Sequence, residues 1–279
     1  MLEMLPHWLS DWLGPDGMAN LAYITNGKHL SWYASVRYTL IAAAFGAILA
    51  VFFGLLGAAA KLSKFAPLRW LGDIYTTMVR GIPDVLFLLF FPLAFEQGVE
   101  YMMAQWYCKP DELAAATTWP LCANVQWYLS TTEYMILACV SLGLVYGAFA
   151  ANVIYGALTA VPKGQLEAAH AFGFPSREVF WRFQVRQMWV YALPGLSNVW
   201  LLLLKATSLL SLLQITDIVS WADRLGAPNY SPVAGLVHGD WRWKYYLVLF
   251  IFYILLTWLS EKFFAYLQAR AGRGMARAN

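Results

Sequence analysis

Charged side chains are scarce in this chain. Asp, Glu, Lys and Arg make up 13% of its 279 residues, whereas hydrophobic residues make up 60%. Soluble proteins carry about 25% charged residues, so this composition excludes an ordinary soluble enzyme and indicates a membrane protein. The net charge is only +3, and the basic residues are spread along the chain. We therefore expect no nucleic-acid partner.

The motifs of catalysis, ATP binding and metal binding are also missing. No G-x-x-x-x-G-K-[ST] occurs; Gly27-Lys28 is the nearest approach, without an upstream glycine at the right distance or a following Ser or Thr. No G-x-S-x-G nucleophile motif occurs. The histidines are far apart in the sequence and show neither H-E-x-x-H nor Cys/His ligand spacing: His7, His29, His170 and His238. The sequence predicts that the chain is not an enzyme and that it holds no metal or cofactor.

Long apolar runs, in contrast, are plentiful. A helix needs about 20 apolar residues to cross a bilayer, and residues 38–60 and 134–161 each run without a charge. Residues 190–216 are interrupted only by Lys205, and residues 245–260 have aromatic and basic flanks. A further span, about 74–95, contains Arg80 and Asp84. We expect an all-α integral membrane protein with about five transmembrane helices.

The distribution of Lys and Arg predicts the orientation. Basic residues follow the first, third and fifth spans, which the positive-inside rule assigns to the cytoplasm. The amino terminus is then periplasmic and the carboxyl terminus cytoplasmic. The first residues lack a basic leader, so the first span itself acts as an uncleaved signal. The expected organisation is an outer segment, 1–34, with Trp8, Trp12 and Trp32 at the membrane surface; a membrane domain, 35–268; and a basic cytoplasmic tail, 269–279.

Two of the chain's three cysteines lie in the long polar segment 97–132, on the predicted outer side. A bridge between Cys108 and Cys122 would close a loop of about 15 residues and contribute roughly 3 kcal/mol. Two free thiols fit the sequence equally well. Cys139 lies in an apolar run, and we expect it in the core.

The connection 162–189, on the predicted cytoplasmic side, contains QLEAAHAFGFPSREVFWRF from Gln165 to Phe183. Its first half has good helix formers, and Gly173 stands where a left-handed cap would end such a helix. Pro175 then begins a second short element. The sequence predicts two short helices that meet at a glycine.

These residues resemble the coupling loop of the permease subunits of bacterial type I ABC importers. The pattern E-A-A-x-x-x-G begins at Glu167, with VPKGQ before it and YALPGLSN and KATSLLSLL after it. The run MVRGIPD, 78–84, is similar to an R-G-x-P element of the same permeases. The resemblance covers roughly residues 35–264 and is strongest to the polar amino acid branch, in particular the histidine/lysine/arginine/ornithine and opine permeases.

The resemblance implies a subunit of the bacterial inner membrane that forms half of a translocation pathway for polar, basic amino acids or a related opine. Its partners would be two ABC ATPase subunits, which hold ATP and Mg²⁺, a sister permease in a heterodimer, and a periplasmic binding protein. Coupling to the ATPases falls on the loop residues Glu167, Ala168, Ala169, Gly173 and Phe174. The alternative is a stand-alone secondary transporter or channel, for which two matching halves with broken helices would be expected.

Intramembrane polar groups are candidates for the pathway or for structural charges. Arg80 and Asp84 stand four residues apart, so on one helix they would share a face and could pair; Gly81 and Pro83 between them suggest a kink or a break. Alternatively, Arg80 only marks the cytoplasmic interface, and Asp84 faces the subunit interior toward the substrate path. Lys205 lies about 22 Å along the fourth span; it lines the pathway, closes a structural ion pair or reaches the outer headgroups. Three hydrogen-bonding residues of the same span complete the set: Asn198, Thr207 and Ser208.

Related permeases often carry an acid and an arginine, three residues apart, just before the VPKG-like turn. This chain has Asn152 and Tyr155 there, so both charges are absent. We carry over no function of that pair.

Overall fold

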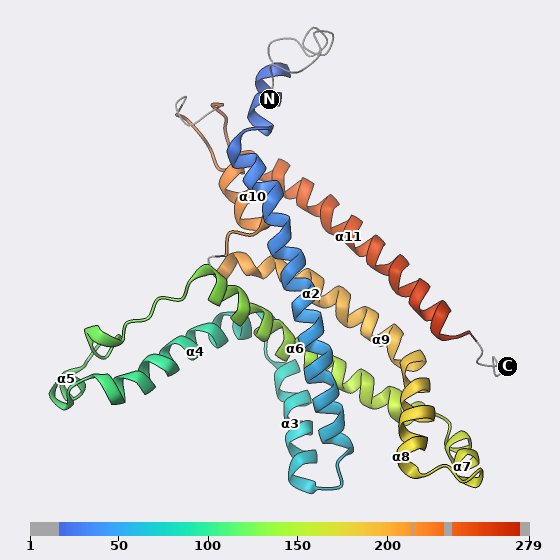
Figure 1. Cartoon of the computed structure of the whole chain (residues 1–279). Coiled ribbons are helices and arrows are strands. Elements are labelled where there is room, and N and C mark those ends of the chain that lie inside the picture. Colours follow the sequence, from blue (N-terminus) through green and yellow to red (C-terminus); the bar gives the residue numbers. More distant parts are fainter. Residues whose placement is uncertain (1–16, 214, 232–235, 274–279) are drawn as a thin grey trace.

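The computed structural model describes residues 17–213, 215–231 and 236–273 (Figure 1). All regular elements in these ranges are helices. Five segments are long and apolar enough to cross a membrane, which confirms the predicted all-α membrane fold. They are α2 (Gly27–Leu62), α4 (Asp84–Tyr107), α6 (Thr131–Ala160), the continuous run Ser176–Leu213, and α11 (Arg242–Ala271).

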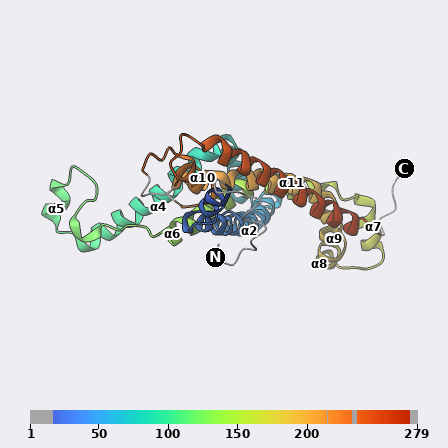
Figure 2. The ribbon, with the colours of Figure 1, turned by 90° about the horizontal axis from the view of Figure 1, so that it is seen from above.

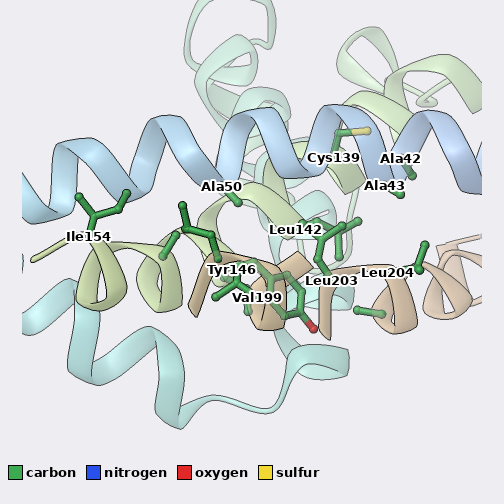
Figure 3. Close-up of a cluster of buried hydrophobic side chains, with 14 of the residues drawn as sticks. Ala42, Ala43, Ala50, Cys139, Leu142, Tyr146, Ile154, Val199, Leu203 and Leu204 are labelled. Atoms are coloured by element: carbon green, nitrogen blue, oxygen red, sulfur yellow. The ribbon is translucent and has the colours of Figure 1, made fainter. Parts of the chain in front are cut away.

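Helix α6 is the centre of the fold and packs against α2, α3, α4 and α9. Its closest neighbour is α2, because small residues let the two backbones approach. A β-carbon at Gly143 would lie 2.5 Å from the Leu49 Cβ, and one at Gly54 would lie 2.7 Å from the Ala150 Cβ. Figure 3 shows the core that results, which includes Cys139, as predicted. In lipid the hydrophobic effect does not drive helices together. Close van der Waals packing of the two backbones therefore holds α2 against α6.

Side-chain caps fix where the helices begin. The Asn26 side chain accepts a hydrogen bond of 3.0 Å from the His29 N–H at the start of α2. Ser130 and Glu133 form a capping box at the start of α6. Asp217 caps α10 (Ile218–Gly226) through a 2.9 Å bond from the Ser220 N–H. Each cap satisfies N–H groups that a helix leaves without an internal partner.

The second span differs from the prediction. The chain forms α3 (Ala66–Gly81), leaves the helix at Ile82 and Pro83, and resumes as α4 at Asp84. Ile82 has extended backbone angles, φ −87° and ψ 132°, which is the conformation that a following proline favours. The break between Gly81 and Pro83 is therefore real. The bounds 74–95 are wrong, because the two helices extend beyond them at both ends.

The first helix extends beyond its apolar run. Helix α2 begins at Gly27, whereas the predicted span begins at residue 38. Trp32 is only 6% exposed, and its indole N–H donates a 3.0 Å bond to the Ile218 carbonyl oxygen. Trp32 is thus a core residue between α2 and α10, and its prediction as a surface anchor is wrong. Trp8, Trp12 and residues 274–279 of the predicted tail lie outside the described residues.

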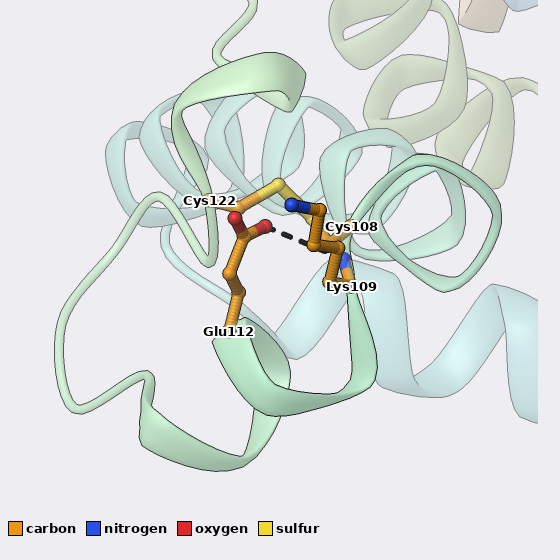
Figure 4. Close-up of a disulfide and its surroundings, with 4 residues drawn as sticks. All are labelled: Cys108, Lys109, Glu112 and Cys122. Carbon is orange, nitrogen blue, oxygen red and sulfur yellow. Dashed lines mark hydrogen bonds between the residues drawn. A yellow bond between two sulfur atoms is a disulfide. The ribbon is translucent and has the colours of Figure 1, made fainter.

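The segment between α4 and α6 forms an arm that extends away from the bundle (Figures 1 and 2). It contains α5 (Pro110–Ala115) and the short 3₁₀ turn η2 (Ala123–Val125). A disulfide joins Cys108 and Cys122, whose Cα atoms are 6.1 Å apart (Figure 4). Glu100, 5% exposed, accepts hydrogen bonds from the Trp127 N–H at 2.7 Å and from the Trp119 indole. The disulfide and the hydrogen bonds to Glu100 therefore stabilise the structure of the arm.

Candidate functional site

The predicted coupling helix is present as α7 (Lys163–Ala171), which begins directly after α6. Glu167 and Ala168 are exposed on it, whereas Ala169 is 4% exposed and faces the protein. Ala169 and the partly buried Leu166 hold this short helix against the core, and most of its surface is left free. The free side carries the acidic group and the small neighbour that were singled out from the sequence.

Gly173 ends α7 in the left-handed conformation that the sequence predicts, with φ +87°. The Gly173 N–H donates to the His170 carbonyl oxygen at 2.9 Å, and the Phe174 N–H donates to that of Ala169 at 3.2 Å. These two bonds form a Schellman motif. A residue with a β-carbon would be strained here, so glycine fixes the direction in which the chain leaves α7.

Two exposed aromatic residues of this loop were missed in the sequence analysis. Phe172 is 84% exposed at the end of α7, and Trp181 is 62% exposed in the next element. Large apolar side chains in an otherwise polar loop were the available signal. Phe174, in contrast, packs edge-on against Phe183 with ring centroids 5.2 Å apart. Phe174 therefore stabilises the loop, whereas Phe172 and Trp181 remain open to a partner.

The second half of the loop continues into the membrane without interruption. It forms α8 (Ser176–Glu178), a π-helical turn η3 (Val179–Gln184) and then α9 (Val185–Ala206). The Gln184 side-chain amide donates a 3.1 Å bond to the Leu158 carbonyl oxygen of α6. π-Helical turns occur frequently at functional sites. Both ends of the loop are thus fastened to the membrane helices, at the end of α6 and at the start of α9.

The break in the second span separates Arg80 from Asp84. The Arg80 guanidinium lies 5.0 Å over the Phe149 ring, and Asp84 Oδ2 accepts a 2.6 Å hydrogen bond from the Tyr146 hydroxyl. None of the ion pairs between described residues joins the two charges. The predicted Arg80–Asp84 pair on one helical face is wrong, because Pro83 ends the helix between them. Each charge instead meets an aromatic residue of α6.

The other polar candidates are distributed along α9 and its end. Asn198 is exposed on α9, and Lys205 is exposed in its last turn, where the helix dipole favours a cation. Thr207 is 0% exposed, and its hydroxyl donates to the Leu204 carbonyl oxygen at 2.7 Å. The Ser208 hydroxyl donates to that of Lys205 at 2.8 Å. Both hydroxyls bond to carbonyl oxygens where α9 passes into the 3₁₀ helix η4 (Thr207–Leu213), whereas Asn198 and Lys205 are exposed.

Comparison with known proteins identifies the family. Residues 46–273 match the model of the binding-protein-dependent transport system inner membrane component. The chain belongs to this family of importer permeases. The permease is 33% identical over 242 residues to the histidine/lysine/arginine/ornithine transport system permease protein HisQ of Escherichia coli K12. The aligned region covers 86% of this chain and 93% of HisQ. It is 33% identical over 244 residues to the nopaline transport system permease protein NocQ of Agrobacterium fabrum, covering 85% and 89%.

Solved structures agree on the fold. The permease superposes with a TM-score of 0.64 on a crystal structure described as an amino acid ABC transporter with histidines, at 19% identity and with 86% and 93% of the two chains covered.

A third sequence relative is the E. coli K12 arginine ABC transporter permease protein ArtQ, which is 30% identical over 230 residues. The aligned region covers 82% of this chain and 87% of ArtQ. These likenesses favour an ABC importer over a stand-alone transporter or channel. The permease is thus an inner-membrane transport subunit, which is not itself catalytic.

Proposed function

We propose that the permease forms half of a translocation pathway for a polar, basic amino acid or an opine derived from one. A periplasmic binding protein delivers the substrate, and two ATPase subunits supply the energy. The names of relatives at about 30% identity support this substrate class. The observation that carries the coupling role is α7 itself, an exposed helix with Glu167 and Phe172 on its free surface and a glycine-fixed end.

In this mechanism α7 docks in a cleft of the ATPase. Phe172 enters an apolar part of the cleft, and Glu167 meets a basic group beside it. ATP and Mg²⁺ are bound by the ATPases, whose closure moves the two coupling helices toward each other. This requires α7 in the cytoplasm, which the positive-inside pattern supports, so the amino terminus is periplasmic and the carboxyl terminus cytoplasmic.

The second half of the pathway comes from a sister permease of similar topology. Helix α9 contains Arg186 near its start and Lys205 in its last turn, but no Asp or Glu. Two identical copies would therefore bring four cations and no counter-charge from this helix, which suits a cationic substrate poorly. A heterodimer removes this difficulty if the sister permease supplies the carboxylate.

The test is a complex reconstituted in proteoliposomes with its ATPase and binding protein. We expect Glu167→Lys to lower binding-protein-stimulated ATP hydrolysis and uptake by about tenfold or more, because like charges across an interface cost several kcal/mol. Gln165→Lys is the matched control, because it adds a lysine on another side of the same exposed helix. Normal coupled activity in Glu167→Lys, or an equal loss in Gln165→Lys, would contradict the assignment of Glu167.

A further inference from the structure

Lys61 joins three helices near the end of the bundle that carries α7. It lies in the last turn of α2, and its side chain is only 16% exposed. Its Nζ donates to Asn152 Oδ1 of α6 at 2.7 Å and to Thr76 Oγ1 of α3 at 3.3 Å, and it pairs with Asp73 Oδ1 of α3 at 3.5 Å. Two of the three ammonium donors thus have hydrogen-bond acceptors on other helices, and Asp73 supplies a counter-charge.

The surroundings are adapted to this cation. The Thr76 hydroxyl is 1% exposed and donates its own proton to the Gly72 carbonyl oxygen at 2.9 Å, so its lone pair faces Lys61. The Tyr155 ring lies 5.1 Å below Nζ and adds a cation–π contact. Asn152 and Tyr155 are the positions where charges were expected and are absent. The cation that these two residues contact comes instead from α2.

Helix α3 also lies in close contact with α2 and α6. A β-carbon at Gly72 would lie 3.0 Å from the Ala60 Cβ and 3.0 Å from the Lys61 Cγ. The Tyr75 hydroxyl donates a 2.7 Å bond to the Leu144 carbonyl oxygen of α6. The ends of α2, α3 and α6 therefore separate only if Lys61 loses its acceptors, and a largely buried cation without partners is costly.

This cluster lies between the coupling helix and the broken span. Helix α6 ends at Ala160 and α7 begins at Lys163. Helix α3 runs from the cluster, at Asp73 and Thr76, to the break at Ile82 and Pro83, about 9 to 14 Å at 1.5 Å per residue. We propose that Lys61 is a positioning residue that holds the ends of α2, α3 and α6 as one rigid lever, so that displacement of α7 moves the Arg80–Asp84 break. This inference rests on the proposed role of α7 as the docking helix.

Coupling is tested in the reconstituted complex with Lys61→Met, which keeps the length of the side chain and removes the cation. We expect the ratio of binding-protein-stimulated to basal ATP hydrolysis to fall about fivefold or more, as is usual when two coupled sites become independent. Asn152→Leu should do the same, whereas Asn152→Asp keeps an acceptor and should stay near the wild type. Lys64→Met is the matched control, because Lys64 is an exposed lysine near the same helix end. The double variant Lys61→Met/Asn152→Leu should be no worse than Lys61→Met alone, since that substitution already removes the contact with Asn152.

A second readout does not require transport. Spin labels at the exposed positions Leu62 and Thr159 report the distance between the ends of α2 and α6. In the purified wild-type complex we expect one narrow distribution of the distance between the labels, with and without trapped ATP. In Asn152→Leu we expect this distance distribution to be broad. Unchanged stimulation and an unchanged distribution in folded Asn152→Leu would overturn the inference, whether or not Lys61→Met folds. A wild-type complex with no stimulated hydrolysis would contradict the proposed function instead, and the spin-label distances would still decide the role of Lys61.

Discussion

Tyr146 and Asp84 connect the middle of α6 to the first turn of α4 through a hydrogen bond of 2.6 Å. On the other side of the break, Arg80 lies over Phe149, one turn further along α6. The rings of Tyr146 and Phe149 are themselves stacked, with centroids 6.0 Å apart. A pair of neighbouring aromatic residues thus holds both charged flanks of an interrupted membrane helix.

We expect Tyr146→Phe to weaken this connection. The variant keeps the ring and removes the donor to Asp84, which should lower the unfolding free energy by about 1 kcal/mol, the usual scale for a hydrogen bond between membrane helices. Thermal unfolding of the purified complex measures the change. Tyr134→Phe is the control, because Tyr134 also lies on α6 and meets a carboxylate, Glu96, but at 3.4 Å. Equal melting temperatures for the two variants would contradict a special role for the Tyr146 bond.

The features that were predicted correctly depend on local signals. The membrane spans follow from hydropathy, the end of α7 from Gly173, and the break from Pro83, because each needs only a few adjacent residues. The bounds were less accurate. Helix α2 continues from the apolar run back to Gly27, since the Asn26 cap and the packing of Trp32 extend it.

The features that were missed depend on residues distant in sequence. Lys61 looked like a topological flank, because its acceptors Thr76 and Asn152 belong to two other helices. Trp32 looked like a headgroup anchor until α10 covered it. The pairing of Arg80 with Asp84 was inferred from helical spacing across a proline that ends the helix. In each case the tertiary environment of the side chain decided its role, and the periodicity of the sequence does not contain that information.

Replacement of Gly173 tests the geometry of the loop. Valine at φ +87° would be strongly disfavoured, since even unbranched L-residues pay about 1–2 kcal/mol in the left-handed region. We expect Gly173→Val to insert in the membrane at a normal level but to lose the ATPase during purification. Gly173→Asn should retain much of the bound ATPase, because asparagine tolerates the left-handed conformation better than valine does. Equal ATPase recovery with both variants would show that the Schellman turn is unimportant for docking.

The arm offers a prediction that is independent of transport. Cys108→Ser should leave the membrane helices intact and make residues 109–121 more sensitive to protease, because the bridge restricts a loop of about 15 residues and contributes roughly 3 kcal/mol locally. Peptide mapping without reductant should recover Cys108 and Cys122 as a linked pair in the wild type. Cys139→Ala is the control, since Cys139 is buried in the core. Protease patterns that do not differ between the two variants would count against a stabilising bridge.

Asp217 provides the clearest pH dependence among the groups outside the spans. It is 0% exposed; Oδ1 caps α10, and Oδ2 has no hydrogen-bond partner among the described residues. Burial raises the pKa of this carboxyl above its ordinary value of 3.8, although the hydrogen bonds from the start of α10 oppose the rise. The folded state therefore binds the proton more tightly than the unfolded state does. Its stability should fall as the pH rises from about the ordinary Asp value through the raised one.

We expect Asp217→Asn to remove this part of the pH dependence. Asparagine caps a helix about as well as aspartate, so the bond from the Ser220 N–H should persist while the buried charge disappears. The variant should differ least from the wild type at the acidic end of the range, and it should be more stable at pH 8, where the raised pKa makes ionisation of the buried acid cost free energy. Thermal unfolding followed by tryptophan fluorescence from pH 4 to pH 8 measures the difference. Asp223→Asn serves as the control, because Asp223 lies on the same helix with its side chain 52% exposed. Parallel pH profiles for the wild type and Asp217→Asn, or a variant less stable at pH 8, would mean that the Asp217 carboxylate is stabilised in the fold by contacts beyond its cap.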